Sequence, residues 1–202
     1  MLVLFAHPAL EKSRINAVLI EAVRNLPGVT FRDLYEEYPD FGIRPEVEQE
    51  LLLRHDTIVL HHPFYWYSSP AILKEYQDLV LQHGWAYGAG GEALNGKAVL
   101  QVITTGGRES AYQPGGINRF TMREMLVPFE QTVRLCGMDY LPPFIVHGSF
   151  RANRDEVRAE ATKYRRVVEA LRDRTVNRAT LSEYDRINSD AALAAMGVPV
   201  GG

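Results

Sequence analysis

Residues 7–16 combine side chains and a predicted helix start that could bind an anion. Ser13 is a plausible N-cap, and the helix would open with Arg14, Ile15 and Asn16. Free backbone N–H groups and the helix dipole favour a phosphate at such a position, and Ser13, Asn16 and His7 could contact it. Serine is also common at helix caps and His-Pro in turns. The segment alone therefore leaves a ligand site and a plain turn about equally favoured.

Four consecutive aromatic residues follow a predicted strand, namely Phe64, Tyr65, Trp66 and Tyr67. Successive side chains diverge, so the four rings cannot all face one core. Some of them must line a surface cleft, where a flat aromatic ligand would stack well. An aromatic interface between two subunits is the alternative. We favour the ligand, and both interpretations can hold together.

A third segment, Thr104, Thr105, Gly106 and Gly107, follows another predicted strand. Paired glycines allow close approach of the backbone to a ligand and expose N–H donors. Such donors could stabilise negative charge that develops on a bound group. The same four residues also suit a plain turn. Residues 83–91, rich in glycine and aromatic side chains, could shape the pocket or form an anchored surface loop.

Short apolar runs that alternate with amphipathic stretches must position these segments. Strands are expected at 2–6, 29–35, 57–61 and 98–104, and a fifth should end at 144–147. Helical spacing predicts a helix from 15 to 26, and Pro45 can start a second with Glu46 and Glu48 near its positive end. Further helices should begin at 69–70, at a Thr121/Glu124 capping box and at an Asn153/Glu156 cap. At Pro128 the fourth helix should either kink or have its true start.

Five strand–helix units predict an α/β fold with a parallel sheet. Five strands fit the flavodoxin-like order 2-1-3-4-5, with helices on both faces, better than the six-stranded dinucleotide fold. We expect one domain over 1–175 and a C-terminal extension over 176–202, either frayed or packed on a neighbour. Ligands bind beyond the carboxyl ends of such strands, where all three segments should lie.

Composition excludes several classes of protein. The net charge of −3 gives no electrostatic case for nucleic-acid binding. The single cysteine, Cys136, excludes an internal disulfide and a cysteine zinc site, and the histidine spacing predicts no metal. No G-x-G-x-x-G or Walker pattern is present. With no signal peptide or apolar run of membrane-spanning length, we expect a cytoplasmic protein.

Taken in order, the motifs resemble the flavodoxin-like NAD(P)H:quinone oxidoreductases over about residues 1–172. The resemblance is strongest to the small bacterial branch that serves as ancillary subunits of glutathione-regulated potassium-efflux systems. The matching pieces are Ala6-His7-Pro8, Ser13-x-x-Asn16, residues 34–41, 62–67, 83–88, 94–97 and 104–107, Cys136-Gly137 and residues 141–144.

The resemblance implies a flavin, FMN by preference with FAD possible, and NAD(P)H as electron donor. By position, His7 and residues 13–16 would hold the flavin phosphate. Residues 64–67 would bound the ring, through backbone groups and Trp66, and residues 104–107 would cradle its polar edge.

The resemblance also implies two-step hydride transfer, from NAD(P)H to the flavin and then to a quinone-like acceptor. In larger relatives a tyrosine and a histidine lie beside the flavin. Tyr112 matches the tyrosine, whereas the histidine position is Asn118 here. Asparagine can donate a hydrogen bond but cannot act as a general acid. Tyr112 could equally be an exposed loop tyrosine.

The resemblance further implies a homodimer with active sites at the subunit interface. One alternative is a regulatory subunit of a membrane potassium-efflux antiporter that keeps its flavin mainly as structure, which would place the protein at the inner face of the membrane. An arginine-rich helix face (Arg158, Arg165, Arg166, Arg172) could meet such a partner or simply be solvated. Nitroarene or azo reduction on the same scaffold is another alternative, and a flavin-free module is disfavoured.

Overall fold

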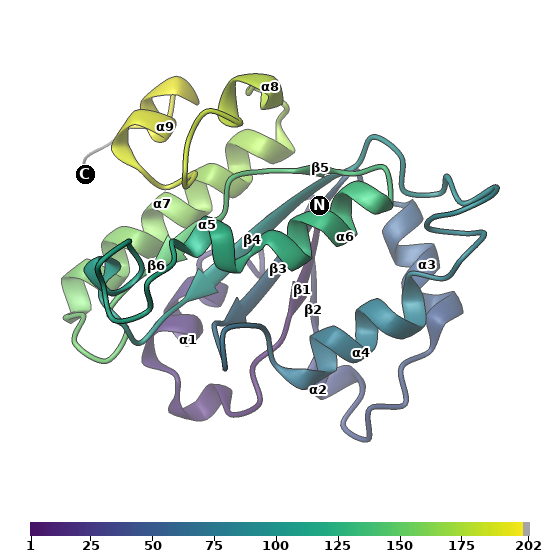
Figure 1. The fold of residues 1–202 in the computed structure, drawn as a ribbon, viewed down its shortest axis with the longest axis horizontal. Helices are drawn as coiled ribbons and strands as arrows, with labels where there is room; N and C mark the ends of the chain where they lie inside the picture. Colours follow the sequence, from purple (N-terminus) through teal and green to yellow (C-terminus); the bar gives the residue numbers. More distant parts are fainter. Residues whose placement is uncertain (200–202) are drawn as a thin grey trace.

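The computed structural model describes residues 1–199 and contains one twisted sheet with helices on both sides (Figure 1). The strands are β1 (Leu2–Phe5), β2 (Thr30–Asp33), β3 (Thr57–Pro63), β4 (Ala98–Thr104), β5 (Asp139–Tyr140) and β6 (Phe144–Val146). The helices are α1 (Arg14–Glu21), α2 (Leu34–Glu37), α3 (Pro45–Leu53), α4 (Ala71–Val80), α5 (Met122–Met125), α6 (Val127–Leu135), α7 (Arg154–Arg172), α8 (Arg178–Leu181) and α9 (Asp190–Ala195). Single 3-10 turns occupy Leu10–Lys12 and Glu109–Ala111.

The strand order is β2-β1-β3-β4-β5 and every pairing is parallel, as the sequence predicted. The fifth strand is divided in two, because both β5 and β6 pair with β4. Pro142 and Pro143 lie between the two pieces, and proline has no N–H group to donate to the neighbouring strand. Since β6 continues along β4, the loop after Val146 still lies at the carboxyl end of the sheet.

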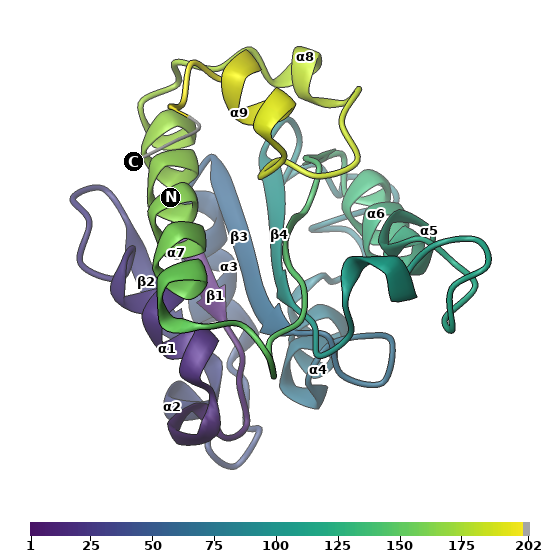
Figure 2. The same cartoon turned by 90° about the vertical axis from the view of Figure 1, so that its left-hand side faces the viewer.

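The two faces of the sheet are covered by different helices. One core joins α1 and α7 to side chains such as Val59 and Val102, and the other joins α3 and α4 to Leu4 and Leu60. Figure 2 shows α1 and α7 on one side of the strands and α4, α5 and α6 on the other. Every residue of β3 and β4 is buried, which explains why most of their side chains are apolar.

Three predicted boundaries are wrong. The third strand does not end at His61, because its pairing with β4 continues through His62 and Pro63. The second strand does not reach Tyr35, because the Asp33 carboxylate accepts a hydrogen bond from the Tyr35 backbone N–H (3.0 Å) and starts the short helix α2. The first helix ends at Glu21 rather than near Leu26, and turns continue the chain to Pro27. A local cap thus overrides the apolar pattern at the second strand.

Both predicted capping boxes are confirmed, whereas α4 begins after Pro70 without the side-chain cap that Ser69 could have supplied. Thr121 and Glu124 form a capping box at α5, and Asn153 and Glu156 form one at α7. Pro128 occupies the first turn of α6, so of the two alternatives at this proline the structure shows a helix start rather than a kink.

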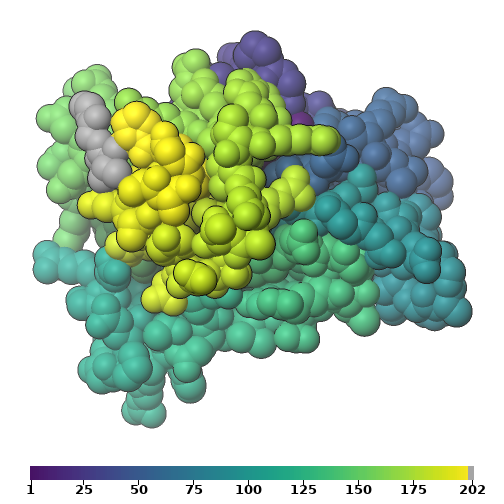
Figure 3. Space-filling model, turned by 90° about the horizontal axis from the view of Figure 1, so that it is seen from above, coloured from purple at the N-terminus to yellow at the C-terminus, as the bar shows by residue number. Residues whose placement is uncertain are grey.

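The C-terminal extension packs on the body of the protein. Leu181, Ile187 and Leu193 are fully buried in the core that contains α7. Asn188 accepts a hydrogen bond from the Ile145 N–H (3.1 Å) and donates one to the Ile145 carbonyl (3.0 Å). Asn188 thereby pairs the backbone N–H and C=O groups on the outer edge of β6, as another strand would. Figure 3 shows the extension, in yellow-green and yellow, lying against α7.

We expect Asn188→Ala to lower the free energy of unfolding by about 2 kcal/mol, because it leaves both backbone groups of buried Ile145 without partners. Urea titration followed by circular dichroism measures the change. Ser182→Ala is the matched control, since that hydroxyl is exposed in the same extension, and it should change stability by less than about 0.5 kcal/mol. Equal midpoints for the two variants would show that the extension does not protect the sheet edge.

Candidate functional site

A cavity of about 520 Å³ lies at the carboxyl ends of β3 and β4, within the usual size range for small-molecule sites. Nine of the sequence-predicted site residues line it: His7, Ser13, Arg14, Ile15, Asn16, Phe64, Tyr65, Thr104 and Gly106. The three segments singled out in the sequence thus meet at one place. The β2-β1-β3 reversal of strand order lies beside it, as expected for this fold.

The start of α1 provides an anion-binding wall. Ser13 Oγ caps the helix by accepting a hydrogen bond from the Asn16 backbone N–H (3.3 Å). The N–H groups of Arg14 and Ile15 have no acceptor within residues 1–199 and remain able to bind a ligand. Lys12 and Arg14 add positive charge to the lining. These features together fit a phosphate.

His7 lies on the same wall as a neutral ring. Burial lowers the pKa of His7, and the nearby Glu11 carboxylate only partly opposes this shift. Its Nδ1 accepts a hydrogen bond from the Ala9 N–H (3.1 Å), which leaves the ring proton on Nε2. His7 can therefore donate one hydrogen bond without carrying a charge.

The aromatic segment forms a strained two-residue turn. Tyr65 and Ser68 exchange backbone hydrogen bonds of 3.2 and 2.9 Å, and the intervening Trp66 and Tyr67 have φ angles of 50° and 63°. Bulky residues rarely adopt this left-handed conformation, and such strain clusters at functional sites. Phe64 and Tyr65 line the cavity, whereas Trp66 and Tyr67 do not, and Trp66 is 94% exposed.

The double-glycine turn divides its roles between lining and support. Thr104 and Gly106 line the cavity. Thr105 is buried instead, and its hydroxyl donates to the Gly107 carbonyl (2.9 Å), which holds the turn. A Cβ atom at Gly106 would lie only 2.3 Å from the Phe150 ring. Glycine therefore lets that ring approach the turn.

Tyr112 and Asn118 lie beside the aromatic and glycine segments. The Tyr112 ring is edge-on to Phe64, with centroids 6.2 Å apart, and would be 3.0 Å from a Cβ atom at Gly107. The Tyr67 hydroxyl donates a hydrogen bond to Asn118 Oδ1 (3.2 Å). Neither Tyr112 nor Asn118 lines the 520 Å³ cavity itself, so any contact with a ligand would be made at its edge.

Five lining residues were missed by sequence reasoning: Ala9, Lys12, Pro63, Ser149 and Phe150. Ser149 and Phe150 follow β6, so the rule that located the other loops at strand ends would have found them. The same loop places His147 3.2 Å from the Thr105 hydroxyl, where burial lowers the pKa of His147 to about 4. His147 is thus a neutral support for the double-glycine turn.

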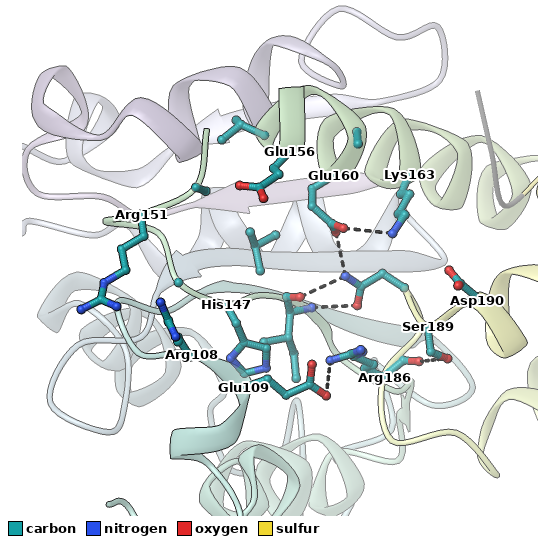
Figure 4. A pocket seen from close by; sticks show the side chains of 17 residues that line it. Arg108, Glu109, His147, Arg151, Glu156, Glu160, Lys163, Arg186, Ser189 and Asp190 are labelled. Atoms are coloured by element: carbon teal, nitrogen blue, oxygen red, sulfur yellow. Dashed lines mark hydrogen bonds and ion pairs between the residues drawn. The ribbon is translucent and has the colours of Figure 1, made fainter. Parts of the chain in front are cut away.

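A larger cavity, about 710 Å³, lies between α7 and the C-terminal extension. Glu109 and Arg186 form an ion pair there (2.7 Å), and Glu160 binds Lys163 (3.0 Å), as Figure 4 shows. Its charged groups largely neutralise one another. It lacks the helix start, aromatic turn and paired glycines of the smaller cavity, which therefore remains the candidate site.

Within residues 1–199, no helix is long and apolar enough to cross a membrane. The same residues contain no cluster of three or more histidine, cysteine or acidic side chains arranged to hold a metal ion.

Comparison with known proteins identifies the family. The sequence model of the flavodoxin-like fold matches residues 1–168. An uncharacterized NAD(P)H oxidoreductase, YrkL, of Bacillus subtilis is 44% identical over 162 residues, covering 80% of this chain and 93% of its own. The glutathione-regulated potassium-efflux system ancillary protein KefG of Pectobacterium carotovorum is 47% identical over 164 residues, which cover 81% of this chain and 90% of KefG.

Two solved structures are also similar. General stress protein 14 of Treponema denticola in complex with FMN has a TM-score of 0.80 and 37% identity, covering 84% of this chain and 98% of its own. An NADPH-quinone reductase from P. pentosaceus has a TM-score of 0.75 and 34% identity, covering 82% of this chain and 95% of its own. The sheet order, the position of the cavity and these matches agree, and the chain belongs to the family of proteins with the flavodoxin-like fold.

Proposed function

We propose that this protein is a flavin-dependent NAD(P)H:quinone oxidoreductase that binds FMN in the 520 Å³ cavity. The observation that carries the proposal is the meeting of a free helix start, an aromatic turn and a glycine turn in one cavity. The FMN named with the Treponema denticola structure and the activities named for the oxidoreductase relatives support it.

Each wall has a role suited to one part of FMN. The N–H groups of Arg14 and Ile15, the Ser13 hydroxyl and the Lys12 ammonium would bind the phosphate. Phe64 and Tyr65 would bound the ring, with Trp66 near its exposed side. The backbone of residues 104–107 would face the polar ring edge and stabilise negative charge there. FAD remains the alternative cofactor.

The bound flavin supplies hydride acceptance and donation, so NAD(P)H and a quinone-like acceptor can react in turn at one site. Tyr112 would position the acceptor through its hydroxyl, and Asn118 would hold the aromatic turn through Tyr67. Neither Asn118 nor neutral His147 is a source of protons near pH 7, so Tyr112 or solvent would supply them.

The visible absorption spectrum of purified protein, before and after anaerobic NADPH or NADH, tests the proposal. We expect a yellow protein that either nucleotide bleaches and that a quinone then restores. A colourless protein that takes up neither FMN nor FAD on titration would overturn the proposal. If the protein behaves as expected, a panel of acceptors that includes nitroarenes and azo dyes would separate quinone reduction from the reduction of those compounds.

We further propose a homodimer that uses the surface around α5 and α6. Four large apolar side chains are exposed there: Ile117 (86%), Phe120 (56%), Val127 (45%) and Leu135 (64%). Trp66 is also exposed, on the neighbouring aromatic turn. Light scattering at micromolar protein should give twice the 22.8 kDa chain mass, and a monomeric mass would contradict this assembly.

The regulatory alternative rests on the similarity to KefG. A cytoplasmic subunit of a potassium-efflux antiporter with a mainly structural flavin would keep a tightly bound flavin and show negligible turnover. The arginine-rich face of α7 gives this alternative little support. Arg158 pairs with Asp155 (3.9 Å), Arg165 with Glu169 (2.9 Å) and Arg172 with Asp173 (2.7 Å), while Arg166 donates to the Pro199 carbonyl. We therefore favour the reductase.

A further inference from the structure

A chain of hydrogen bonds leads from His61 on β3 to Ser13 in the anion-binding wall at the start of α1. His61 Nε2 lies 3.1 Å from Asn16 Oδ1. The Asn16 amide nitrogen in turn donates to Ser13 Oγ (2.9 Å) and to Thr104 Oγ1 (3.1 Å). His61 is fully buried and Asn16 is 2% exposed, so water does not compete for these groups.

Asn16 uses both of its amide hydrogens within the protein. It therefore cannot donate its side chain to a phosphate, which corrects the direct role that its sequence position predicted. Its effect on a ligand must pass through Ser13. Ser13 Oγ accepts from both the backbone N–H (3.3 Å) and the side chain of Asn16, so its lone pairs are occupied. Only its O–H remains, and Ser13 lines the cavity.

The ring proton of His61 selects this arrangement. Asn16 Oδ1 can only accept, so His61 Nε2 must carry the proton. His61 Nδ1 has no hydrogen-bond partner within the described chain. Burial lowers the pKa of His61 to about 3, so the ring stays neutral and Nδ1 bears no hydrogen at ordinary pH.

If the Asn16 amide were reversed, the Ser13 hydroxyl would donate its hydrogen to Asn16 and no longer to a ligand. Reversal would place the Asn16 amide nitrogen against His61 and its oxygen against Ser13 Oγ. The His61 proton would then have to move to Nδ1, a fully buried position without an acceptor. The Ser13 hydroxyl hydrogen would then bond to Asn16 and would not be available to the phosphate.

We propose that His61 is a positioning residue for the cofactor phosphate, which fixes the Asn16 amide so that the Ser13 hydroxyl points its hydrogen into the cavity. This inference rests on the proposed flavin function, and it assigns phosphate recognition to a residue that never touches the ligand. Removing His61 lets both amide orientations occur, because an apolar side chain prefers neither.

The test compares FMN with riboflavin, which lacks the phosphate, in fluorescence titrations of the flavin-free protein. We expect His61→Leu to lower the ratio of the riboflavin to the FMN dissociation constant on the order of tenfold, the usual effect of one hydrogen bond to a charged group. His61→Gln, whose amide can donate near the Nε2 position, should retain the ratio. In a Ser13→Ala background, His61→Leu should change the ratio no further.

His62→Leu is the matched control, because His62 is equally buried on the same strand but faces Phe129 and Gln101 on the opposite side of the sheet. It should leave the ratio unchanged. If His61→Leu weakens FMN and riboflavin by the same factor, or weakens neither, His61 has only a packing role and the inference is wrong. If wild-type protein binds neither flavin, the proposed function itself fails.

A measurement on the wild-type protein keeps the inference testable if His61→Leu does not fold. Nitrogen-15 NMR of the histidine side chains should find the His61 proton on Nε2. A proton on Nδ1 would reverse the Asn16 amide and overturn the inference.

Discussion

Between pH 6 and pH 5 the free energy of unfolding is expected to fall by roughly 3 kcal/mol, because three histidines are held without charge in the folded protein. Burial lowers the pKa of His61 to about 3 and the pKa values of His62 and His147 to about 4. In the unfolded chain all three rings titrate at about 6.5. Below that pH the unfolded state takes up about three protons that the folded state excludes, so acid favours unfolding.

Urea titrations at pH 7, 6 and 5 measure this slope. His62→Leu should reduce it by the contribution of one proton, about 1.4 kcal/mol per pH unit at most. Burial is the cause of the lowered His62 pKa. The neutral ring also has fixed partners, since its Nδ1 donates to the Pro63 carbonyl (3.0 Å) and its Nε2 accepts from the Gln101 amide (3.0 Å). A His61 or His62 ring whose NMR signals titrate near pH 6 in the folded protein would contradict this explanation.

Glu48→Ala should destabilise the protein by about 3 kcal/mol, because it removes the anion from a buried ion pair. Glu48 Oε1 accepts hydrogen bonds from Arg32 Nε (2.7 Å) and from the Tyr38 hydroxyl (2.5 Å). Glu48 is fully buried and the Arg32 side chain is 14% exposed, so little solvent replaces the lost carboxylate. Arg32 keeps its other partner, Glu37 (3.2 Å), which places the expected loss at the lower end of the range for buried pairs.

The same helix offers a matched control. Glu50 pairs with Arg54, and both side chains are more than two-thirds exposed, at 69% and 68%. Glu50→Ala should therefore change stability by less than about 0.5 kcal/mol. Replacing both Glu48 and Arg32 by leucine should recover much of the loss, since no unpaired buried charge remains. Equal stability of Glu48→Ala and Glu50→Ala would show that the buried pair contributes nothing.

The sequence by itself determined the fold class, the sheet order and the three segments that meet in the cavity. These follow from local patterns, because buried strands are short apolar runs, caps lie within three residues of their helices, and parallel strands bring their carboxyl ends to one edge. Thr121 with Glu124 and Asn153 with Glu156 are such local signals, and both form the predicted capping boxes. Cofactor, substrate and partner rested on resemblance and remain proposals.

Tertiary structure decided what individual polar residues do. The sequence placed Glu48 in a favourable first turn of a helix, but only the fold buries it against Arg32. Asn16 was predicted to contact a ligand, yet its partners, His61 and Thr104, lie 45 and 88 residues away. Asn188 lies in the C-terminal extension, yet it completes the edge of β6, 43 residues earlier. Such contacts depend on how distant segments pack, which no local spacing records.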